Sequence, residues 1–378
     1  MLQKIPLSYI EISKKNLIHN FKQFRIYLKK GTLISAVIKS NAYGHGDVEI
    51  VKILSPIADY FQVNSFEELK KIKNCTAKPI LVFGYVGIND LESAIKLGCI
   101  LSVFDLEHLK NINRIAHELN RKQKVHIVID SLLGREGIMS ENAEIFIKNL
   151  LKMKNILVDG VYSHFANIED TADLSYAKKQ IIAYEGAIKF FEKYGFNNLK
   201  KHISATSGVM IYEKSSGNNQ IVRIGIGLYG LWPSEQLEET FKNNIILKPV
   251  LSWKTHIAQV KILPTGYFIG YGLTYKTHKE MKVAVIPQGY ADGFSRALSN
   301  QGEVLIGATR CKVLGRVAMN MFVVDVSHLN KVKVGDEVVI LGQQKNESIS
   351  VEEMAQKFDT INYEIVARIS PLLPRVVG

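Results

Sequence analysis

Eight short apolar runs, separated by amphipathic segments, constrain the fold of this chain more than any other feature of its sequence. Strands that are buried on both faces show such near-continuous apolar runs, and strict strand–helix alternation is typical of parallel α/β folds. Eight repeats favour a TIM (β/α)8 barrel over an open sheet. The runs lie at 33–39, 60–63, 80–85, 100–104, 125–130, 157–164, 200–205 and 221–224.

The pattern changes after Pro233, where strand-like runs follow one another closely and turn signals separate them. Helical patterns are few there, and the clearest runs from Val351 to Phe358. This arrangement predicts a mainly antiparallel β domain. We therefore expect three parts: an N-terminal strand within residues 1–12 that pairs with the β domain, a (β/α)8 barrel over residues 13–244, and the β domain over residues 245–378.

Composition limits the function classes. The 378 residues carry a net charge of +12, but the lysines are scattered and form no basic block, so a nucleic-acid role would rest on charge alone. The three cysteines have neither disulfide nor metal-ligand spacing. No apolar stretch approaches the ~18 residues of a membrane span, and no secretory signal is visible. We expect a cytoplasmic protein that binds no metal, membrane or nucleic acid.

Lys39 stands at the end of the first barrel run, where the chain turns into the polar, glycine-containing stretch Ser40 to Gly46. Burial beside a strand end lowers the pKa of an ammonium group, which makes the amine a usable nucleophile or base. A covalent bond to an aldehyde cofactor requires such an amine. The alternative is a lysine that extends to the rim and has no chemical role.

Other polar residues follow later barrel runs, where the active sites of such barrels lie. Singly, each has an ordinary explanation, because loop arginines are mostly surface residues and lone histidines are mostly structural. Their convergence at one rim favours an active site. They are Arg135, His164, Ser207 and Arg223.

The stretch Gly225 to Gly230 satisfies the dinucleotide pattern G-x-G-x-x-G literally. Pro233 follows closely and would end the required helix, so we reject that interpretation. Glycines after the last barrel strand can still expose backbone N–H groups to a phosphate. In the β domain, Tyr271 and Tyr290 sit in glycine-flanked turns, where they are either turn aromatics packed on a sheet or functional residues.

The sequence resembles the alanine racemase family over nearly its whole length. The lysine stretch Ala36 to Gly46 resembles that family's pyridoxal-phosphate lysine motif. Further similar motifs are Gly134-Arg135, Ser163-His164-Phe165, Val222-Arg223-Ile224-Gly225-Ile226, Gly270-Tyr271-Gly272, Gly289-Tyr290-Ala291-Asp292-Gly293 and Gly315-Arg316-Val317-Ala318-Met319. The resemblance implies a pyridoxal 5'-phosphate enzyme that interconverts L- and D-alanine through an aldimine and supplies D-alanine for peptidoglycan. It also implies a homodimer that shares its active sites between subunits.

The same resemblance assigns roles to the residues. Lys39 would hold the cofactor and exchange the α-proton on one face, and Tyr271 of the other subunit would serve the other face. Arg223 would face the pyridine nitrogen, His164 would support Tyr271, and Arg135 would contact the cofactor's phenolic oxygen and the substrate. The phosphate would be held by Tyr43, Ser207, Gly225 and Ile226, and the substrate pocket would be lined by Met319, Tyr290 and Asn320.

Three positions depart from the family pattern. Asn320 stands where the family commonly has Asp, and Pro371 stands where many members have a phosphate-binding tyrosine. Val128 replaces a lysine that some members carry carbamylated beside the arginine, so Arg135 must be oriented by something else, such as an anion. These changes put fine substrate preference in doubt.

Alternatives remain. A racemase of the same family could prefer serine or accept several amino acids, although a pocket lined by Tyr271, Tyr290 and Met319 should be small. A barrel-type pyridoxal-phosphate decarboxylase shares the fold, but the Tyr271 turn and Arg223 argue against it. A non-catalytic pyridoxal-phosphate carrier would lack residues 241–378.

Overall fold

The computed structural model describes residues 6–213 and 219–378, which form two compact units. The barrel unit comprises Ile18–Ser40 and Ile50–Lys248. The β unit comprises the segment that ends at Leu17, together with Asn41–Glu49 and Pro249–Gly378. The predicted barrel is one continuous segment over residues 13–244, whereas here the segment directly after Ser40 groups with the β unit. Each unit is described below by itself.

Eight parallel strands form the sheet of the barrel unit, and a further short strand, β7 (Ile138–Met139), pairs with β6. The strand order runs from β10 through β2 to β9. The sheet closes because Gln220 donates its N–H to the carbonyl of Lys201 at 3.0 Å and Arg223 donates to Ser204 at 3.1 Å. This confirms the predicted barrel. The strands are β2 (Leu33–Val37), β3 (Tyr60–Val63), β4 (Ile80–Val82), β5 (Ile100–Val103), β6 (Gln123–Asp130), β8 (Ile156–Tyr162), β9 (Lys200–His202) and β10 (Ile221–Ile224).

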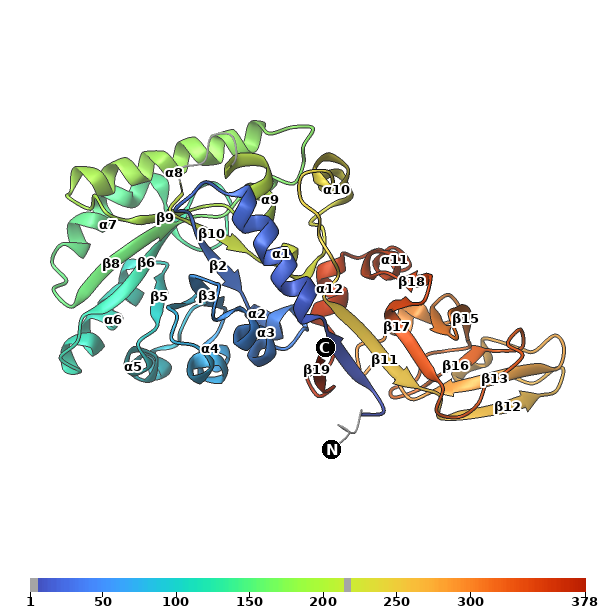
Figure 1. The fold of residues 1–378 in the computed structure, drawn as a ribbon. Helices are drawn as coiled ribbons and strands as arrows, with labels where there is room; N and C mark the ends of the chain where they lie inside the picture. The colour runs from blue at the N-terminus through green and yellow to red at the C-terminus, as the bar shows by residue number, and fades with distance from the viewer. Residues whose placement is uncertain (1–5, 214–218) are drawn as a thin grey trace. The chain divides into compact units, whose positions relative to one another are not determined.

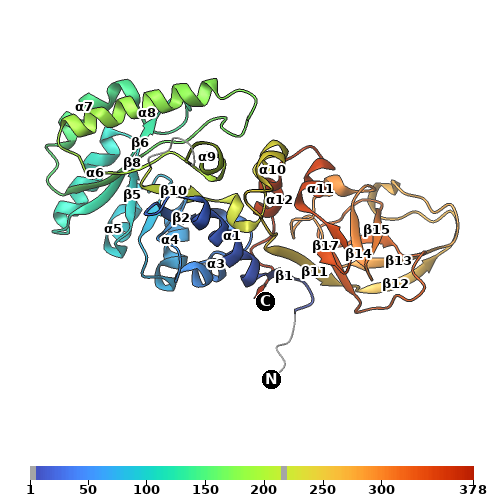
Figure 2. The ribbon, with the colours of Figure 1, turned by 45° about the horizontal axis from the view of Figure 1, so that its top comes forward.

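Helices α4 to α8 lie on the outside of these strands (Figures 1 and 2). Ser65 caps α4 with a capping box, since its side chain accepts from the N–H of Glu68 and the Glu68 side chain accepts from the N–H of Ser65. In the parts of the chain that the structure describes, no helix is long and apolar enough to cross a membrane. The helices are α1 (Lys14–Tyr27), α3 (Asp47–Leu54), α4 (Phe66–Ile72), α5 (Ile88–Leu97), α6 (Leu106–Glu118), α7 (Ala143–Leu150), α8 (Ser175–Lys193), α9 (Thr206–Gly208) and α10 (Glu235–Phe241).

The barrel interior has an apolar layer and a polar one. Tyr60, Leu81, Ile100 and Ile221 form a buried apolar cluster. Because side chains on a strand alternate between faces, the residue two positions further along points to the same side. Those positions include buried polar groups nearer the carboxyl ends of the strands, Ser102 on β5 and Arg223 on β10, and the buried His202 on β9 is bonded to Arg223. The polar layer therefore lies where barrels of this kind place their chemistry.

The turn after β2 is left-handed. The sequence predicts an irregular polar loop there, but Lys39–Tyr43 forms the short helix α2, in which the four residues from Ser40 to Tyr43 have φ between 53° and 55°. Left-handed backbone costs an ordinary residue about 1–2 kcal/mol. The β2 strand ends at Val37, so Lys39 lies just beyond it rather than within it.

The β unit contains a ten-stranded sheet in which nearly all neighbours are antiparallel, as predicted. Strand β1 pairs antiparallel with β11 and parallel with β19. It begins only at Tyr9, and residues 1–5 of the predicted N-terminal strand lie outside the described residues. The elements are β1 (Tyr9–Ile12), β11 (Leu251–His256), β12 (Gln259–Leu263), β13 (Met281–Ile286), β14 (Glu303–Ile306), β15 (Thr309–Leu314), β16 (Phe322–Asp325), β17 (Glu337–Gln344), β18 (Glu347–Ile349), β19 (Arg375–Val377), α11 (Val351–Gln356) and α12 (Asn362–Ala367).

Large aromatic side chains fill the core of the β unit. Phe294 stacks on Phe322 with ring centroids 4.3 Å apart, and Trp253 meets Phe294 edge-on at 6.5 Å. All three are fully buried. The indole N–H of Trp253 donates to Gln288 at 2.8 Å, which satisfies the one polar group of that side chain. Gln288 directly precedes the Gly289–Tyr290 turn, so this core fixes one of the candidate site segments.

Candidate active site

Lys39 lies at the mouth of the barrel, two residues beyond the end of β2. The preceding residue, Ile38, is fully buried and donates its N–H to the carbonyl of Gln62 on β3 at 2.7 Å. Burial lowers the pKa of the Lys39 ammonium, and the cations of Arg135 and Arg223 lower it further. The carboxylates of Glu68 and Glu136 oppose that shift. The sequence argument for a perturbed lysine therefore has a structural basis.

Arg223 on β10 is the centre of the hydrogen-bond network, with only 2% of its surface exposed. One terminal nitrogen donates to His202 Nδ1 and the other to His164 Nδ1, each at 2.9 Å. The guanidinium also bonds to backbone carbonyls and lies over the rings of Phe83 and Tyr162. Burial lowers the pKa of Arg223 to about 10, so the group is a cation at neutral pH.

The state of His164 follows from its contact with Arg223. Burial lowers the pKa of His164 to about 3, with a further contribution from the Arg223 cation, so the imidazole is neutral at physiological pH. An arginine can only donate. His164 Nδ1 must therefore accept, and the single ring proton sits on Nε2. His164 offers an N–H donor to any group that approaches its Nε2.

The tautomers of two further histidines, His202 and His126, follow from the same argument, and the sequence analysis did not select these residues. His202 Nε2 lies 2.8 Å from His126 Nδ1, and His126 Nε2 lies 3.2 Å from Asp159. Lys200 in turn donates to Asp159 at 2.6 Å. Because Arg223 only donates and the carboxylate only accepts, both imidazoles carry their proton on Nε2. Both histidines lie on predicted strands, but alternation along a strand gives two faces and does not tell which of them points into the barrel.

Arg135 lies in the turn after β6, as predicted. Its guanidinium makes a two-point contact with the neighbouring Glu136: Nε donates to one carboxylate oxygen, and a terminal nitrogen donates to the other at 2.8 Å. Val128, which replaces a lysine of the family pattern, is a buried apolar residue on β6. Arg135 therefore has an anionic partner in its own turn, which the sequence analysis did not identify.

The glycine turn after β10 carries Gly225 and Ile226, and Ser207 lies in α9; all of them belong to the barrel unit. Thr206 Oγ1 accepts from the N–H groups of Gly225 and Gly227 at 3.2 and 3.4 Å. Tyr229 donates its hydroxyl to the carbonyl of Val37 at 2.7 Å, which ties the glycine turn to the strand that leads to Lys39. Tyr43 belongs instead to the β unit, where its ring lies 6.1 Å from that of Tyr363.

The remaining predicted residues also lie in the β unit. Tyr290 donates its N–H to the carbonyl of Ala318 at 3.1 Å, and Ala291 donates to that of Met319 at 2.9 Å, so these two turns are joined. A Cβ on Gly289 would lie 2.4 Å from the Met319 carbonyl oxygen, which explains the glycine. Asn320 follows Met319 and is exposed. The structure brings Tyr290, Met319 and Asn320 together.

Tyr271 lies in a third turn of the β unit, which approaches the other two. The backbone of Gly272 leaves only 3.0 Å between a hypothetical Cβ and Nε of Arg316. Asn300 links the turns, since it donates to Thr274 Oγ1 at 3.2 Å and accepts from the N–H of Gly315 at 2.6 Å. Tyr271 itself is 74% exposed. No pattern in the sequence pointed to Asn300, which acts through the fold alone.

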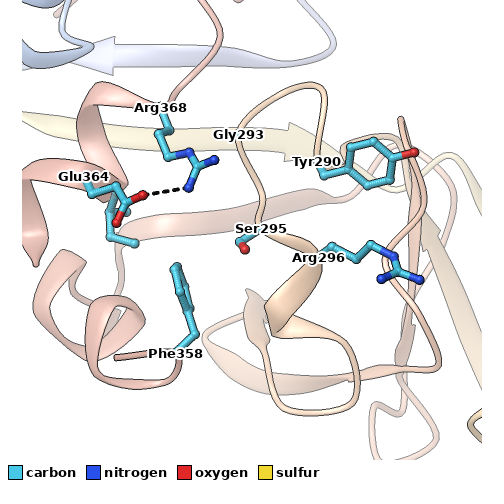
Figure 3. Close-up of a pocket in the computed structure, with 8 residues that line it drawn as sticks. Tyr290, Gly293, Ser295, Arg296, Phe358, Glu364 and Arg368 are labelled. Atoms are coloured by element: carbon cyan, nitrogen blue, oxygen red, sulfur yellow. Dashed lines mark hydrogen bonds and ion pairs between the residues drawn. The ribbon is translucent and has the colours of Figure 1, made fainter. Parts of the chain in front are cut away.

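A pocket of the β unit opens beside the Tyr290 turn (Figure 3). Glu364 accepts from Arg368 at 2.7 Å on one side, while Arg296 and the ring of Tyr290 lie on the other. Its lining is Tyr290, Gly293, Ser295, Arg296, Phe358, Glu364, Ile365 and Arg368.

The barrel residues fit an aldehyde cofactor that also carries a basic ring nitrogen. Lys39 offers an amine whose pKa is lowered, and Arg223 has an Nε–H for which the described residues provide no acceptor. A donor-only cation with one free N–H suits a neutral ring nitrogen. The fold and these groups define the class: a (β/α)8 barrel with a lysine of lowered pKa at its mouth, followed by an antiparallel β unit.

Comparison with known proteins identifies the family. The family model "Alanine racemase, N-terminal domain" matches residues 12–233, and "Alanine racemase, C-terminal domain" matches residues 250–377. An alanine racemase of Leptospira interrogans serogroup Icterohaemorrhagiae serovar copenhageni is 36% identical over 384 residues, which cover 98% of this chain and 95% of that protein. The chain belongs to the alanine racemase family, whose members are pyridoxal-phosphate-dependent isomerases, as its motifs predicted.

Solved structures agree. An alanine racemase of Clostridium difficile 630 matches with a TM-score of 0.93 at 32% identity, over 100% of this chain and 97% of that one. An alanine racemase of Bartonella henselae, described with covalently bound pyridoxal phosphate, shares the fold with a TM-score of 0.85 at 23% identity, over 99% and 100% of the two chains. Each of these two matches covers nearly the whole of this chain, including both its barrel unit and its β unit.

Proposed function

We propose that this protein interconverts L- and D-alanine by a two-base mechanism, with Lys39 and Tyr271 as the bases. The observation that carries the proposal is the buried Arg223, which fixes His164 in one neutral tautomer beside a lysine of lowered pKa. The family membership and the names of the relatives support alanine as the substrate.

The barrel residues would hold the cofactor. Lys39 would bind its aldehyde carbon, and Arg223 would donate Nε–H to the ring nitrogen without protonating it. When bound, the cofactor withdraws electron density from the substrate's α-carbon and makes the α-proton acidic enough to leave. Because Arg223 keeps its proton, it limits that withdrawal and disfavours side reactions such as transamination. The phosphate would be held by Ser207, Gly225, Ile226 and Tyr43.

Lys39 would move the proton on one face of the α-carbon. An amine with a lowered pKa is neutral at a lower pH than an ordinary lysine, so it can accept a proton. After the transfer, the ammonium would return the proton when the reaction runs in the opposite direction.

Tyr271 would serve the opposite face from a second copy of the chain. A free phenol has a pKa of about 10, so it needs a donor to stabilise its anion. His164 has that donor, because its proton lies on Nε2 and its Nδ1 is occupied by Arg223. The exposure of Tyr271 in its own unit fits a side chain that contacts another molecule.

Arg135, Met319, Tyr290 and Asn320 would bind the substrate. Arg135 supplies a cation for its carboxylate, and the bulky Met319 and Tyr290 favour a small side chain, which supports alanine over serine or lysine. The change to Asn320 removes a charge that family members commonly carry, which makes serine the substrate to compare first.

The proposal includes a homodimer in the cytoplasm that supplies D-alanine for peptidoglycan. The barrel predicted over residues 13–244 would carry the cofactor, and the β domain over residues 245–378 would reach the active site of the partner. The exposed aromatic residues of the β unit support this, because Tyr267, Phe268 and Tyr271 lie together on one turn region. Large exposed apolar side chains that cluster are typical of interfaces.

The first experiment measures racemisation of L-alanine, L-serine and L-lysine by chiral separation, with the visible absorbance of bound pyridoxal phosphate recorded alongside. We expect conversion of alanine in the wild type and none in Lys39→Ala. Bound cofactor without alanine turnover would leave the family membership in place and remove the named substrate.

A second experiment tests the shared site. Lys39→Ala and Tyr271→Phe subunits are mixed, dissociated and reassociated. If each active site takes one residue from each subunit, the mixed dimers have one intact site, and the mixture regains about a quarter of the wild-type activity. Activity that stays at the level of the two parents would contradict a site that is shared between subunits.

A further inference from the structure

We propose that Glu136 is a positioning residue, which holds Arg135 by a two-point contact and supplies a directly bonded counter-charge to Arg135 beside Lys39. The part of the proposal that concerns the reaction rests on the function proposed above, whereas the contact itself does not.

The turn that carries both residues is anchored at both ends. Asp130 accepts from the N–H groups of Leu133 and Gly134 at 2.8 and 3.1 Å. Beyond the turn, Ile138 and Met139 form β7, which pairs with the end of β6. The backbone of Arg135 and Glu136 is therefore held between two hydrogen-bonded segments, so the side chains start from fixed positions.

The turn packs closely on β6. A Cβ on Gly137, which has φ of +123°, would lie 2.8 Å from the backbone nitrogen of Asp130 and 3.1 Å from Val128 Cγ1. Val128 thus lies directly under the turn and contributes no polar atom. The Arg135 side chain is 59% exposed, and Glu136 is the residue of this turn that accepts from its guanidinium.

The contact leaves one edge of the guanidinium for a ligand. Glu136 occupies Nε and one terminal nitrogen, so the other terminal nitrogen of Arg135 remains. The hydrogen bonds that Arg135 donates to Glu136 raise the pKa of Arg135. Burial opposes ionisation of Glu136, but the bond and charge of Arg135 outweigh it and lower the pKa of the carboxyl. A two-point arginine–carboxylate pair also fixes the plane of the guanidinium.

Besides burial, four charged groups shift the pKa of the Lys39 amine. Arg135 and Arg223 are cationic, while Glu68 and Glu136 are anionic. Glu68 has other partners, because it accepts from the N–H groups of Ser40 and Asn64 at 2.6 Å each. The nearby His164 is neutral. Removal of Glu136 would leave Asp130 as the remaining carboxylate that acts on Arg135, and the loss of an anion near Lys39 would lower the pKa of the Lys39 amine.

The test uses the full-length protein stripped of cofactor. Trace acetylation across a pH series, followed by peptide mapping with mass spectrometry, gives the pKa of individual lysine amines. Glu136→Gln removes the charge and keeps the size, and Glu136→Asp keeps the charge. Glu141→Gln is the matched control, since Glu141 is an exposed carboxylate in the same segment and is not among the groups that shift Lys39.

We expect a lower Lys39 pKa in Glu136→Gln, a value nearer the wild type in Glu136→Asp, and no change in Glu141→Gln. In the loaded enzyme, the pH at which kcat reaches half its maximum should fall in parallel, and KM for the amino-acid carboxylate should rise. An unchanged Lys39 pKa in Glu136→Gln, or an equal change in Glu141→Gln, would overturn the proposal. Because the labelling needs neither cofactor nor substrate, it is independent of whether alanine is turned over.

Discussion

The candidate residues in the barrel mouth and those in the β unit differ in how completely their own unit fixes them. Arg223 is buried and makes five hydrogen bonds, and His164 is held in one tautomer by one of them. Tyr271 and Met319 are 74% and 56% exposed. The candidate residues of the barrel are therefore organised within their own unit, whereas Tyr271 and Met319 stand on backbone turns of the β unit with their side chains largely exposed.

The two units differ in what fixes their candidate residues. In the barrel, burial shifts pKa values and enforces tautomers, so the electrostatics are built before any ligand arrives. In the β unit, close backbone approaches around Gly272 and Gly289 hold the turns, and the side chains have no fixed surroundings of their own. Such side chains acquire a defined role only against another surface, which is the situation that a shared dimer site provides.

The largest effect should come from the barrel. Replacing Lys39 with Ala removes both the cofactor anchor and one base, and we expect racemisation to fall by at least about 10³-fold. The absorbance of covalently bound cofactor should disappear as well. Lys52→Ala on α3 is the control and should behave as the wild type. Retained covalent absorbance in Lys39→Ala would show that another amine carries the cofactor.

Tyr271→Phe tests the exposed half. In the proposed mechanism the phenol moves a proton on one face alone, so we expect racemisation to fall by about 10²–10⁴-fold while one enantiomer still exchanges its α-proton with solvent. Deuterium incorporation into L- and D-alanine, followed by NMR, separates the two faces. Tyr267→Phe, a change at another exposed tyrosine near the same turn, is the matched control. Equal loss of exchange for both enantiomers would argue against a face-specific role.

The contrast also explains what the sequence could predict. Alternating apolar runs identified the eight barrel strands, because buried parallel strands need continuous apolar residues. Lys39, Arg135, His164 and Arg223 were found by their place after strand ends and by family motifs. His202 belongs to the short strand β9, whose other residues are lysines, so its inward direction depends on a register that the sequence does not display.

Other features were out of reach for a different reason. The left-handed turn of Ser40 to Tyr43 has no sequence signal, since glycine is absent from those four positions and only tertiary contacts impose it. Glu136 contacts Arg135 beside it in the chain, but the two-point geometry depends on the glycines and on Asp130 around the turn. The barrel was predicted as one continuous segment over residues 13–244, although Asn41–Glu49 groups with the β unit. Long-range packing decides each of these.

The buried chain from Arg223 to Asp159 provides a test of how much organisation the barrel contains. Asp159→Leu leaves the Nε2–H of His126 and the ammonium of Lys200 without their acceptor, and we expect a loss of about 1–3 kcal/mol in the free energy of unfolding. Urea denaturation measures this loss. Glu92→Gln, which breaks an exposed pair with Lys96 on α5, should change stability by less than about 1 kcal/mol.

The pH dependence of that stability has a defined sign. Burial raises the pKa of Asp159, but the hydrogen bonds from His126 and Lys200 outweigh burial. In the folded protein the pKa of the Asp159 carboxyl is therefore below that of an ordinary carboxyl. The contribution is then fully present above about pH 4 and declines as the pH falls below that value. Asp159→Asn keeps an acceptor for His126. It should show a shallower loss of stability between pH 4 and 3, because the contribution of the Asp159 carboxylate to that loss is absent. An unchanged acid limb would mean that other carboxylates govern it.

The smallest effect concerns the turn that connects Lys39 to the β unit. Ser40 is exposed and has φ of 55°, a conformation that costs an ordinary residue about 1–2 kcal/mol and costs glycine little. Ser40→Gly should stabilise the protein by about 0.5–1 kcal/mol after the greater unfolded-state entropy of glycine is included. Ser348→Gly in β18, where the backbone is extended, should instead destabilise it. If both variants lose stability alike, the left-handed turn is not strained, and the loop after Lys39 is held by its contacts at no conformational cost.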